Sequence, residues 1–395
     1  MRLGGFTALL LTLLVCVSAC ATPGRLPAVP VGQTANAQPV VPNVRYWPDR
    51  EGDNFVEAAQ ISVAKERAWL ARTGQAHAPP PVAFLAISGG GDAGAFGAGL
   101  LVGWTQRGDR PAFRAVTGIS TGALIAPFAF LGPRYDHVLR EAYTEVSQRD
   151  ILRRRFITAA LWNDAMADSQ PLAGLIKRFI TPQVLSEIAA EAEKGRLLFI
   201  GTTDLDSREP VIWDMTAIAA SRSPAALELF RKVVLASASI PGAFPPVMFD
   251  VTVGGKRYQE MHVDGGTSHQ VFMYPSSFHL KEVAMKDRPR TIYVIRNSRL
   301  DPDWASVDRR TLSIAGRSVS SLIHSQGLGD LTQIFLLAQR DGVKFNLAFI
   351  PADFDVPREH DFDTNYMRAL FERGRRMGVD GSAWRNIPPE YPTLR

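Results

Sequence analysis

The hydrophobic positions of this chain fall into short apolar runs that are separated by polar, turn-rich segments. Such runs predict strands at residues 82–88, 113–119, 197–201, 211–213, 257–263, 291–296 and 345–351. Longer apolar stretches predict helices at residues 95–104, 123–131 and 230–237, and one or two long helices over 313–340. Because strands alternate with helices, we expect a three-layer α/β fold, with helices on both faces of a largely parallel central sheet.

The amino terminus has the pattern of an export signal. Met1 and Arg2 precede an apolar run at residues 3–17, and the segment ends in Val-Ser-Ala-Cys at Cys20. This ending resembles a bacterial lipobox, so we expect residues 1–19 to be a lipoprotein signal peptide and Cys20 to carry the lipid. An ordinary signal peptide with a chance cysteine is the alternative. The protein would then be lipid-anchored in the bacterial cell envelope, on the periplasmic side of the outer membrane.

Residues 20–81 are predicted to connect this anchor to the folded body. The proline-rich stretch 21–48 predicts a flexible tether, and the helical spacing of residues 54–72 predicts an accessory helix packed on the main domain. The chain has only two cysteines, one in the signal and one at the lipobox. A mature protein without a disulfide must rely on a large core, and 395 residues are enough for one.

Charge and composition exclude some partners. The net charge is +5, from 44 basic and 39 acidic residues, which is mild. Arginines cluster at 153–155 and 373–376, as solvated surface or as contacts to anionic lipid headgroups. The chain has neither zinc-ligand spacing nor an aromatic-basic strand pattern, so we expect no nucleic acid and no metal.

The strongest chemical motif is Gly-Ile-Ser-Thr-Gly at residues 118–122. It fits G-x-S-x-G, in which a nucleophilic serine lies on a tight turn between a strand and a helix. Gly118 and Gly122 would let the backbone turn sharply, and Ser120 would lie near the positive end of the following helix. The motif alone is weak, because small residues are common in turns.

A glycine-rich loop precedes this elbow by one strand–helix unit. Gly89, Gly90, Gly91, Asp92 and Gly94 follow a predicted strand and open a predicted helix. The G-x-G-x-x-G spacing also fits a dinucleotide site, but the next strand ends in a serine where the ribose needs an acidic residue. We therefore interpret the loop as an oxyanion hole, formed by backbone N–H groups at a helix start.

A third loop supplies a candidate base. Asp264 ends a predicted strand and is followed by Gly265 and Gly266. A carboxylate there can take the serine proton and later return it. By itself, Asp-Gly-Gly is more typical of a plain turn.

In this order, the three loops resemble the patatin-like phospholipase family of serine acyl hydrolases. Segments 202–206 (TTDLD) and 236–246 (ASASIPGAFPP) resemble further blocks of that family, and the resemblance covers about residues 82–275, less clearly 291–351. It implies a catalytic domain at 82–351 with a C-terminal extension at 352–395. It also implies a patatin-like fold, a Ser120–Asp264 dyad with oxyanion donors at Gly90 and Gly91, no cofactor, and a lipid or phospholipid ester as substrate. The family often has Arg or Lys where this chain has Ala93.

Three alternatives stay open. An α/β-hydrolase would use a Ser-Asp-His triad, for which His269, His324 and His360 are available by order. A membrane-tethered domain could instead bind a lipid or an envelope partner without turning it over. Acyl transfer to an acceptor other than water shares the same acyl-enzyme step. Acyl-chain length, headgroup preference and oligomeric state are not set by these motifs.

Overall fold

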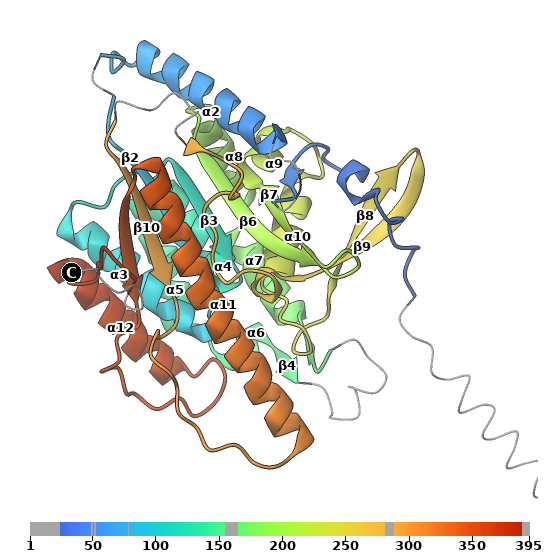
Figure 1. The fold of residues 1–395 in the computed structure, drawn as a ribbon, viewed down its shortest axis with the longest axis vertical. Helices are drawn as coiled ribbons and strands as arrows, with labels where there is room; N and C mark the ends of the chain where they lie inside the picture. Colours follow the sequence, from blue (N-terminus) through green and yellow to red (C-terminus); the bar gives the residue numbers. More distant parts are fainter. Residues whose placement is uncertain are drawn as a thin grey trace, which may run out of the picture.

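The computed structural model describes residues 24–48, 50, 53–77, 79–154, 165–280 and 288–388 (Figure 1). The predicted signal peptide and Cys20 lie outside the described residues, as does Arg155 of the first arginine cluster. Within the described part of the chain, no helix is both long and apolar enough to cross a membrane.

The body is organised around a nine-stranded sheet whose main order is β1-β7-β6-β3-β2-β10-β11. The five strands from β6 to β11 in this order are parallel, whereas β7, β9 and β1 add antiparallel pairs at one side and β8 pairs with β9. This confirms the expected α/β class. The strands are β1 (Arg45–Tyr46), β2 (Val82–Ile87), β3 (Ala115–Ile119), β6 (Leu197–Asp204), β7 (Glu209–Asp214), β8 (Val247–Val253), β9 (Lys256–Asp264), β10 (Arg290–Arg296) and β11 (Lys344–Phe349); a separate pair is formed by β4 (Arg153–Arg154) and β5 (Ala167–Asp168).

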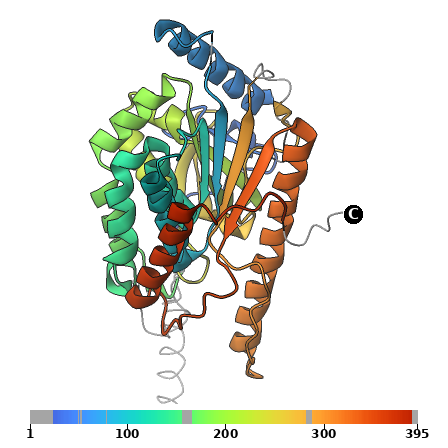
Figure 2. The same ribbon diagram turned by 90° about the vertical axis from the view of Figure 1, so that its left-hand side faces the viewer.

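Helices cover both faces of the sheet (Figure 2). One face carries α2 (Asp53–Arg72) and α11 (Thr311–Asp341), which is one continuous helix. The other carries α3 (Gly94–Arg107), α4 (Thr121–Leu131), α5 (Asp136–Thr144), α6 (Gln148–Ile151), α7 (Gln170–Phe179), α8 (Pro182–Ala192), α9 (Met215–Ala220), α10 (Ala226–Ser237) and α12 (Thr364–Asp380). Short 3-10 turns are η1 (Thr34–Asn36), η2 (Gly91–Ala93), η3 (Pro133–Tyr135) and η5 (Gly265–Thr267).

Two apolar cores result from this layering. β2 is buried at every position, because helices lie on both of its faces. Phe84 and Ala86 pack with Phe55 of α2 and Leu331 of α11. The alternate residues Ala83, Leu85 and Ile87 pack toward α3, α4 and α12. The parallel strands are therefore fixed from both sides, and their carboxyl ends form a rigid edge.

The expected flexible tether at residues 21–48 is contradicted from residue 24 onward. Val41, Val44 and Trp47 are buried in the main core, and Arg45–Tyr46 pairs with β7 as strand β1. The Arg45 guanidinium also forms an ion pair with Glu260 of β9. The isolated apolar residues of this segment show no helical or strand period, yet several of them are buried against the body. The helix expected at 54–72 packs on the domain as predicted, with Phe55 and other apolar residues buried.

The expected boundary at residue 351 has no counterpart in the structure. Helix α12 lies directly against α3, and both helices meet at glycines, so their backbones approach closely. A Cβ at Gly99 or Gly103 of α3 would collide with the α12 backbone at Phe371 or Arg375. Helix α12, in the segment predicted as a C-terminal extension, therefore packs in the same helical layer as α3.

Candidate active site

The three loops singled out in the sequence meet at the carboxyl edge of the parallel strands. The glycine loop follows β2, Ser120 follows β3, and Asp264 ends β9. A Cβ at Gly89 would lie 3.2 Å from the Ser120 Cβ, so the first two loops touch. Asp264 is paired with Thr202 of β6, the strand beside β3. Residues far apart in the sequence thus converge on one small region.

Ser120 occupies a strained backbone conformation. Its φ is 56° and its ψ is −123°, a region that non-glycine residues rarely adopt and that costs of order 1–3 kcal/mol. Gly118 and Gly122 make the turn possible, since a Cβ at either would collide with backbone atoms. The turn presents Ser120 at the first residue before α4, as expected for a serine elbow.

Ser237 holds this elbow in place. The Ser120 N–H donates to Ser237 Oγ at 3.0 Å, and the Ser237 hydroxyl donates to the Gly201 carbonyl at 2.6 Å. Ser237 therefore links the elbow to β6. It lies in the 236–246 block that carried the family resemblance, but no role for it could be read from the sequence because its partners are distant along the chain.

The carboxyl group of Asp264 is buried, and its two oxygens differ in their hydrogen bonding. Its Oδ1 accepts the Gly266 N–H at 2.7 Å, whereas its Oδ2 has no hydrogen-bond partner among the described residues. Burial raises the pKa of Asp264 to about 7, while the Ser120 side chain and the Gly266 N–H act in the opposite direction. Such a carboxyl group can exchange a proton near neutral pH.

The turn after Asp264 needs its first glycine. A Cβ at Gly265 would lie 2.5 Å from the Gly201 carbonyl oxygen, so no larger residue fits there. The glycine lets β9 end tightly against β6 and keeps the Asp264 side chain at the strand edge. The Asp-Gly-Gly motif thus has a steric reason beyond ordinary turn chemistry.

The glycine loop leaves two of its N–H groups available. The Gly89 N–H donates to the Gln270 carbonyl at 3.0 Å, and the Gly94 N–H donates within its own turn to the carbonyls of Gly91 and Asp92. Neither is therefore free to serve as an oxyanion donor. Gly90 and Gly91 have positive φ values of 153° and 58° and no recorded backbone acceptor in the described part of the chain.

Asn297 fixes the shape of this loop. Its Nδ2 donates to the Ser88 carbonyl at 2.9 Å, its backbone N–H donates to Ser88 Oγ at 2.8 Å, and its Oδ1 accepts the Gly97 N–H at 3.0 Å. A Cβ at Gly90 would lie 2.8 Å from the Asn297 Cβ. Asn297 follows β10, and no local pattern indicates this contact, because 200 residues separate Asn297 from Gly97.

The Asp92 side chain bonds to groups outside the glycine loop. It is buried, and its carboxylate accepts the Phe362 N–H at 2.9 Å and pairs with Arg358 at 2.8 Å. Burial raises the pKa of Asp92, and the charge of Arg358 opposes that rise. Asp92 therefore anchors the segment before α12 to the glycine loop, and a basic side chain reaches this loop although residue 93 is alanine.

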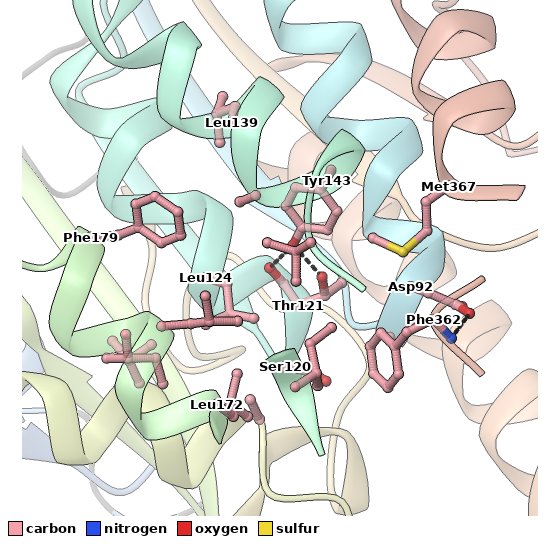
Figure 3. Close-up of a pocket in the computed structure, with 18 of the residues that line it drawn as sticks. Asp92, Ser120, Thr121, Leu124, Leu139, Tyr143, Leu172, Phe179, Phe362 and Met367 are labelled. Carbon is pink, nitrogen blue, oxygen red and sulfur yellow. Dashed lines mark hydrogen bonds between the residues drawn. The ribbon is translucent and has the colours of Figure 1, made fainter. Parts of the chain in front are cut away.

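An apolar pocket opens beside Ser120 (Figure 3). Its volume is about 90 Å³, and Ser120, Gly91 and Asp92 form its polar end. Its wall is apolar: Leu124, Phe128, Leu139, Ala142, Ile151, Leu172, Leu175, Phe179, Phe362 and Met367. Tyr143 closes one side and hydrogen-bonds Thr121, the residue after Ser120. An apolar chain attached to a group at Ser120 would fit this pocket chemically.

The histidines available by order do not complete a triad with Asp264. The Nδ1 of His269 lies 3.2 Å from Asp330, and its ring borders a different cavity, at Gly201 and Gly265. His360 is exposed and contacts the Asp361 carbonyl, and His324 lines a polar cleft near the glycine loop. No hydrogen bond joins Asp264 to any of these three histidines among the described residues. The described residues also contain no cluster of three or more potential metal ligands.

The TTDLD block supports this edge from behind. Thr202 Oγ1 accepts the Trp213 indole N–H at 2.9 Å and lies 2.9 Å from His262 Nδ1. Thr203 Oγ1 lies 2.7 Å from Ser268 Oγ, in the turn that follows Asp264. These bonds hold β6, β7 and β9 in register rather than facing the pocket.

Fold and site together define the class: an α/β protein with a serine elbow, a glycine loop and an acidic strand end at the carboxyl edge of its sheet. The patatin-like phospholipase family model matches residues 85–273, which contain all three loops. The chain therefore carries a patatin-like phospholipase domain over these residues.

Two other comparisons add little. A search of the curated proteins finds no match. Among solved structures, the crystal structure of VipD from Legionella pneumophila matches with 11% identity and a TM-score of 0.32, covering 78% of this chain and 68% of that chain. A likeness this weak carries no argument about the reaction.

Proposed function

We propose that this protein is a serine acyl hydrolase that cleaves carboxylic esters of lipids with a Ser120–Asp264 dyad. The observation that carries the proposal is the buried Asp264 carboxyl group, with one unpaired oxygen beside the strained serine elbow. A structural aspartate in this position would be expected to have both oxygens satisfied. The family match supports a lipid as the substrate.

In the proposed reaction, the Ser120 oxygen bonds to the ester carbonyl carbon while Asp264 takes the hydroxyl proton. The negative oxygen of the tetrahedral intermediate accepts hydrogen bonds from the Gly90 and Gly91 N–H groups. The intermediate then breaks its bond to the alcohol, which leaves with the proton from Asp264. Water attacks the acyl-enzyme as Asp264 takes its proton, and that proton returns to Ser120 when the fatty acid leaves.

The surroundings suit each step. Ser120 lies at the amino end of α4, and the glycine loop lies at the amino end of α3, so both helices favour developing negative charge. The apolar pocket lined by Leu124 and Phe179 would take the acyl chain. Losing one oxyanion donor typically lowers the rate about 10²- to 10³-fold.

We also propose that the protein works at a membrane of the bacterial cell envelope, through a lipid on Cys20. The support is the sequence pattern of residues 1–20, outside the described part of the chain. Metabolic labelling with an alkyne fatty acid tests it. Label should be present in the full chain and absent from the Cys20→Ser variant.

The reaction is tested with a fluorophosphonate probe and a short-chain nitrophenyl ester. Wild-type protein should be labelled and should hydrolyse the ester, whereas Ser120→Ala should lose both, with a rate loss of roughly 10⁴-fold or more. Ser382→Ala, which removes an exposed serine hydroxyl after α12, is the matched control and should behave as wild type. Folded wild-type protein that is neither labelled nor active would instead favour lipid binding without turnover.

A further inference from the structure

A second cavity, the polar cleft, adjoins the glycine loop. Its volume is about 610 Å³, and its lining includes Gly89, Gly90, Arg296, Asn297, Arg317 and Arg358. The apolar pocket is bordered by Gly91 and Ser120 of the same edge, and Asp92 borders both cavities. Any ester whose carbonyl lies at the loop can therefore extend in two directions, one apolar and one polar.

Arg296 is the unusual residue of the polar cleft. It ends β10 and is only 3% exposed, yet its guanidinium has neither a hydrogen-bond nor an ion-pair partner among the described residues. Burial lowers the pKa of Arg296 to about 10, with Asp330 opposing, so the group is still charged at neutral pH. The carboxylate of Asp330 already accepts the backbone N–H groups of Gln270 and Val271, at 2.5 and 3.3 Å.

The fold makes room for this charge. A Cβ at Gly327 of α11 would lie 2.6 Å from the Arg296 Cζ, so only glycine lets the guanidinium lie there. A buried charge without a partner costs several kcal/mol, and native proteins rarely leave one unsatisfied. The chain carries this cost at the edge where the proposed chemistry takes place, which points to a partner outside the protein.

The other arginines of the polar cleft already have carboxylate partners. Arg358 pairs with Asp92 at 2.8 Å, Arg317 with Asp303 at 3.5 Å, and the Arg299 Nε donates to Asp301 at 3.0 Å. They add positive charge to the walls but are offset by these acids. Arg296 alone combines burial, full charge and a missing partner.

We propose that Arg296 binds the phosphate group of a glycerophospholipid, so that the polar cleft holds the headgroup while the apolar pocket holds the acyl chain. This inference rests on the proposed ester hydrolysis at Ser120. A guanidinium is suited to phosphate, because its planar N–H groups donate two parallel charge-assisted hydrogen bonds. Arg296 is then a specificity-determining residue, which favours an ester that carries a phosphate group over a neutral ester.

The test compares two soluble substrates with the same ester bonds: dihexanoylglycerol and dihexanoylphosphatidylglycerol, each below its critical micelle concentration. Wild-type protein should favour the phospholipid. Arg296→Met should lower the kcat/KM ratio of phospholipid to neutral ester by roughly 10- to 100-fold, the size of a lost hydrogen-bond pair to a charged group. Arg296→Lys should retain part of the preference.

A stability measurement separates this role from a structural one. Because Arg296→Met removes a buried unpaired charge, its melting temperature should equal or exceed that of wild type in the absence of substrate. A strong loss of stability together with an unchanged substrate ratio would overturn the inference. Arg257→Met, which removes an exposed arginine on the β8–β9 hairpin that is paired with Asp250, is the control and should change neither quantity.

Further outcomes are distinguishable. Dihexanoylphosphatidylcholine should behave like the phosphatidylglycerol if phosphate itself is recognised, because both carry that group. Equal turnover of phospholipid and neutral ester, with inorganic phosphate stabilising wild type but not Arg296→Met, would assign a free-phosphate site and overturn the headgroup assignment.

A substrate preference that does not depend on Arg296 also overturns the headgroup assignment, whereas a wild type that hydrolyses nothing contradicts the proposed function itself. If Arg296→Met fails to fold, competition by glycerol 3-phosphate, but not glycerol, against neutral-ester hydrolysis by wild type takes its place.

Discussion

Strand β9 carries two buried carboxyl groups, Glu260 and Asp264, whose environments are opposite. The two residues are four apart, so their side chains lie on the same face of the strand. The Glu260 carboxylate accepts a hydrogen bond from the Arg45 guanidinium at 3.0 Å, and its Oε2 lies 3.3 Å from His262 Nε2. Asp264 has one backbone N–H and an oxygen without a hydrogen-bond partner among the described residues.

Their proton affinities differ accordingly. Burial by itself would raise the pKa of Glu260, but the His262 hydrogen bond and the Arg45 charge hold it below its ordinary value. Burial of Asp264 is not offset in this way, and its pKa rises to about 7. The middle of the strand therefore holds a charged group that joins β1 to β9, and its carboxyl end holds a carboxyl group able to gain and lose a proton.

The largest effect is expected when the ionisable group of Asp264 is removed. Asp264→Asn keeps an acceptor for the Gly266 N–H but cannot take the proton of Ser120. We expect ester hydrolysis to fall roughly 10³- to 10⁴-fold while the fold persists. Steady-state kinetics on a nitrophenyl ester measures the loss, and circular dichroism checks the fold. Near-normal turnover would remove Asp264 from the dyad.

A change at Glu260, in the middle of the strand, should lower stability instead of the reaction rate. Glu260→Gln leaves Arg45 buried without its charge partner, so we expect the free energy of unfolding to fall by roughly 3–5 kcal/mol. Denaturant unfolding measures this, and the kcat of the folded fraction should stay near wild type. A variant as stable as wild type would mean that this pair does not hold the amino-terminal segment to the sheet.

The same contrast has a pH signature. The ordinary pKa is 3.8 and the folded one about 7, so at intermediate pH the folded protein keeps the Asp264 proton that the unfolded chain releases. The stability contributed by this proton is complete below the ordinary pKa and is lost as pH rises to about 7. Asp264→Asn has no titrating group at this position. Its free energy of unfolding, relative to that of wild type, should therefore rise by roughly 2–3 kcal/mol between pH 5 and pH 8. Denaturant melts at the two pH values test this, and a pH-independent difference contradicts it.

The smallest effect concerns the pocket beside the dyad. Ala142→Leu on α5 adds bulk to the apolar wall without touching Ser120 or Asp264. We expect the kcat/KM ratio of hexanoyl to acetyl ester to fall roughly 3- to 10-fold, as overpacking costs about 1–3 kcal/mol. Parallel assays of the two esters give the ratio. An unchanged ratio would show that the acyl chain lies elsewhere.

The contrast also marks what could be predicted from the sequence. The serine elbow, the glycine loop and Asp264 were found because each motif is local and its glycines have a steric purpose. The central parallel strands were found because their residues are apolar throughout. Antiparallel β8 was not predicted, since its alternating burial gives a weaker signal.

The partners of the site are mostly long-range and could not be predicted. Ser237, Asn297 and Arg296 act on loops more than a hundred residues away or face a cleft that only the fold creates. The packing of residues 24–48 was missed because it rests on isolated apolar residues without a period. Helix α12 was missed although its buried residues follow a helical spacing from Met367 to Gly378, because two of them are glycines that allow close helix contact and add little to an apolar pattern. Local motifs predicted which residues form the proposed site, and tertiary contacts decide how they are held.

The backbone of Ser120 has a consequence for how this sequence can drift. Glycine adopts a φ of 56° and a ψ of −123° far more readily than serine, so Ser120→Gly would relieve strain that Ser120→Ala would keep. A lineage that only bound lipids would gain stability by accepting glycine, through a single codon change. Selection for catalysis, acting against stability, would keep a serine at this strained backbone position.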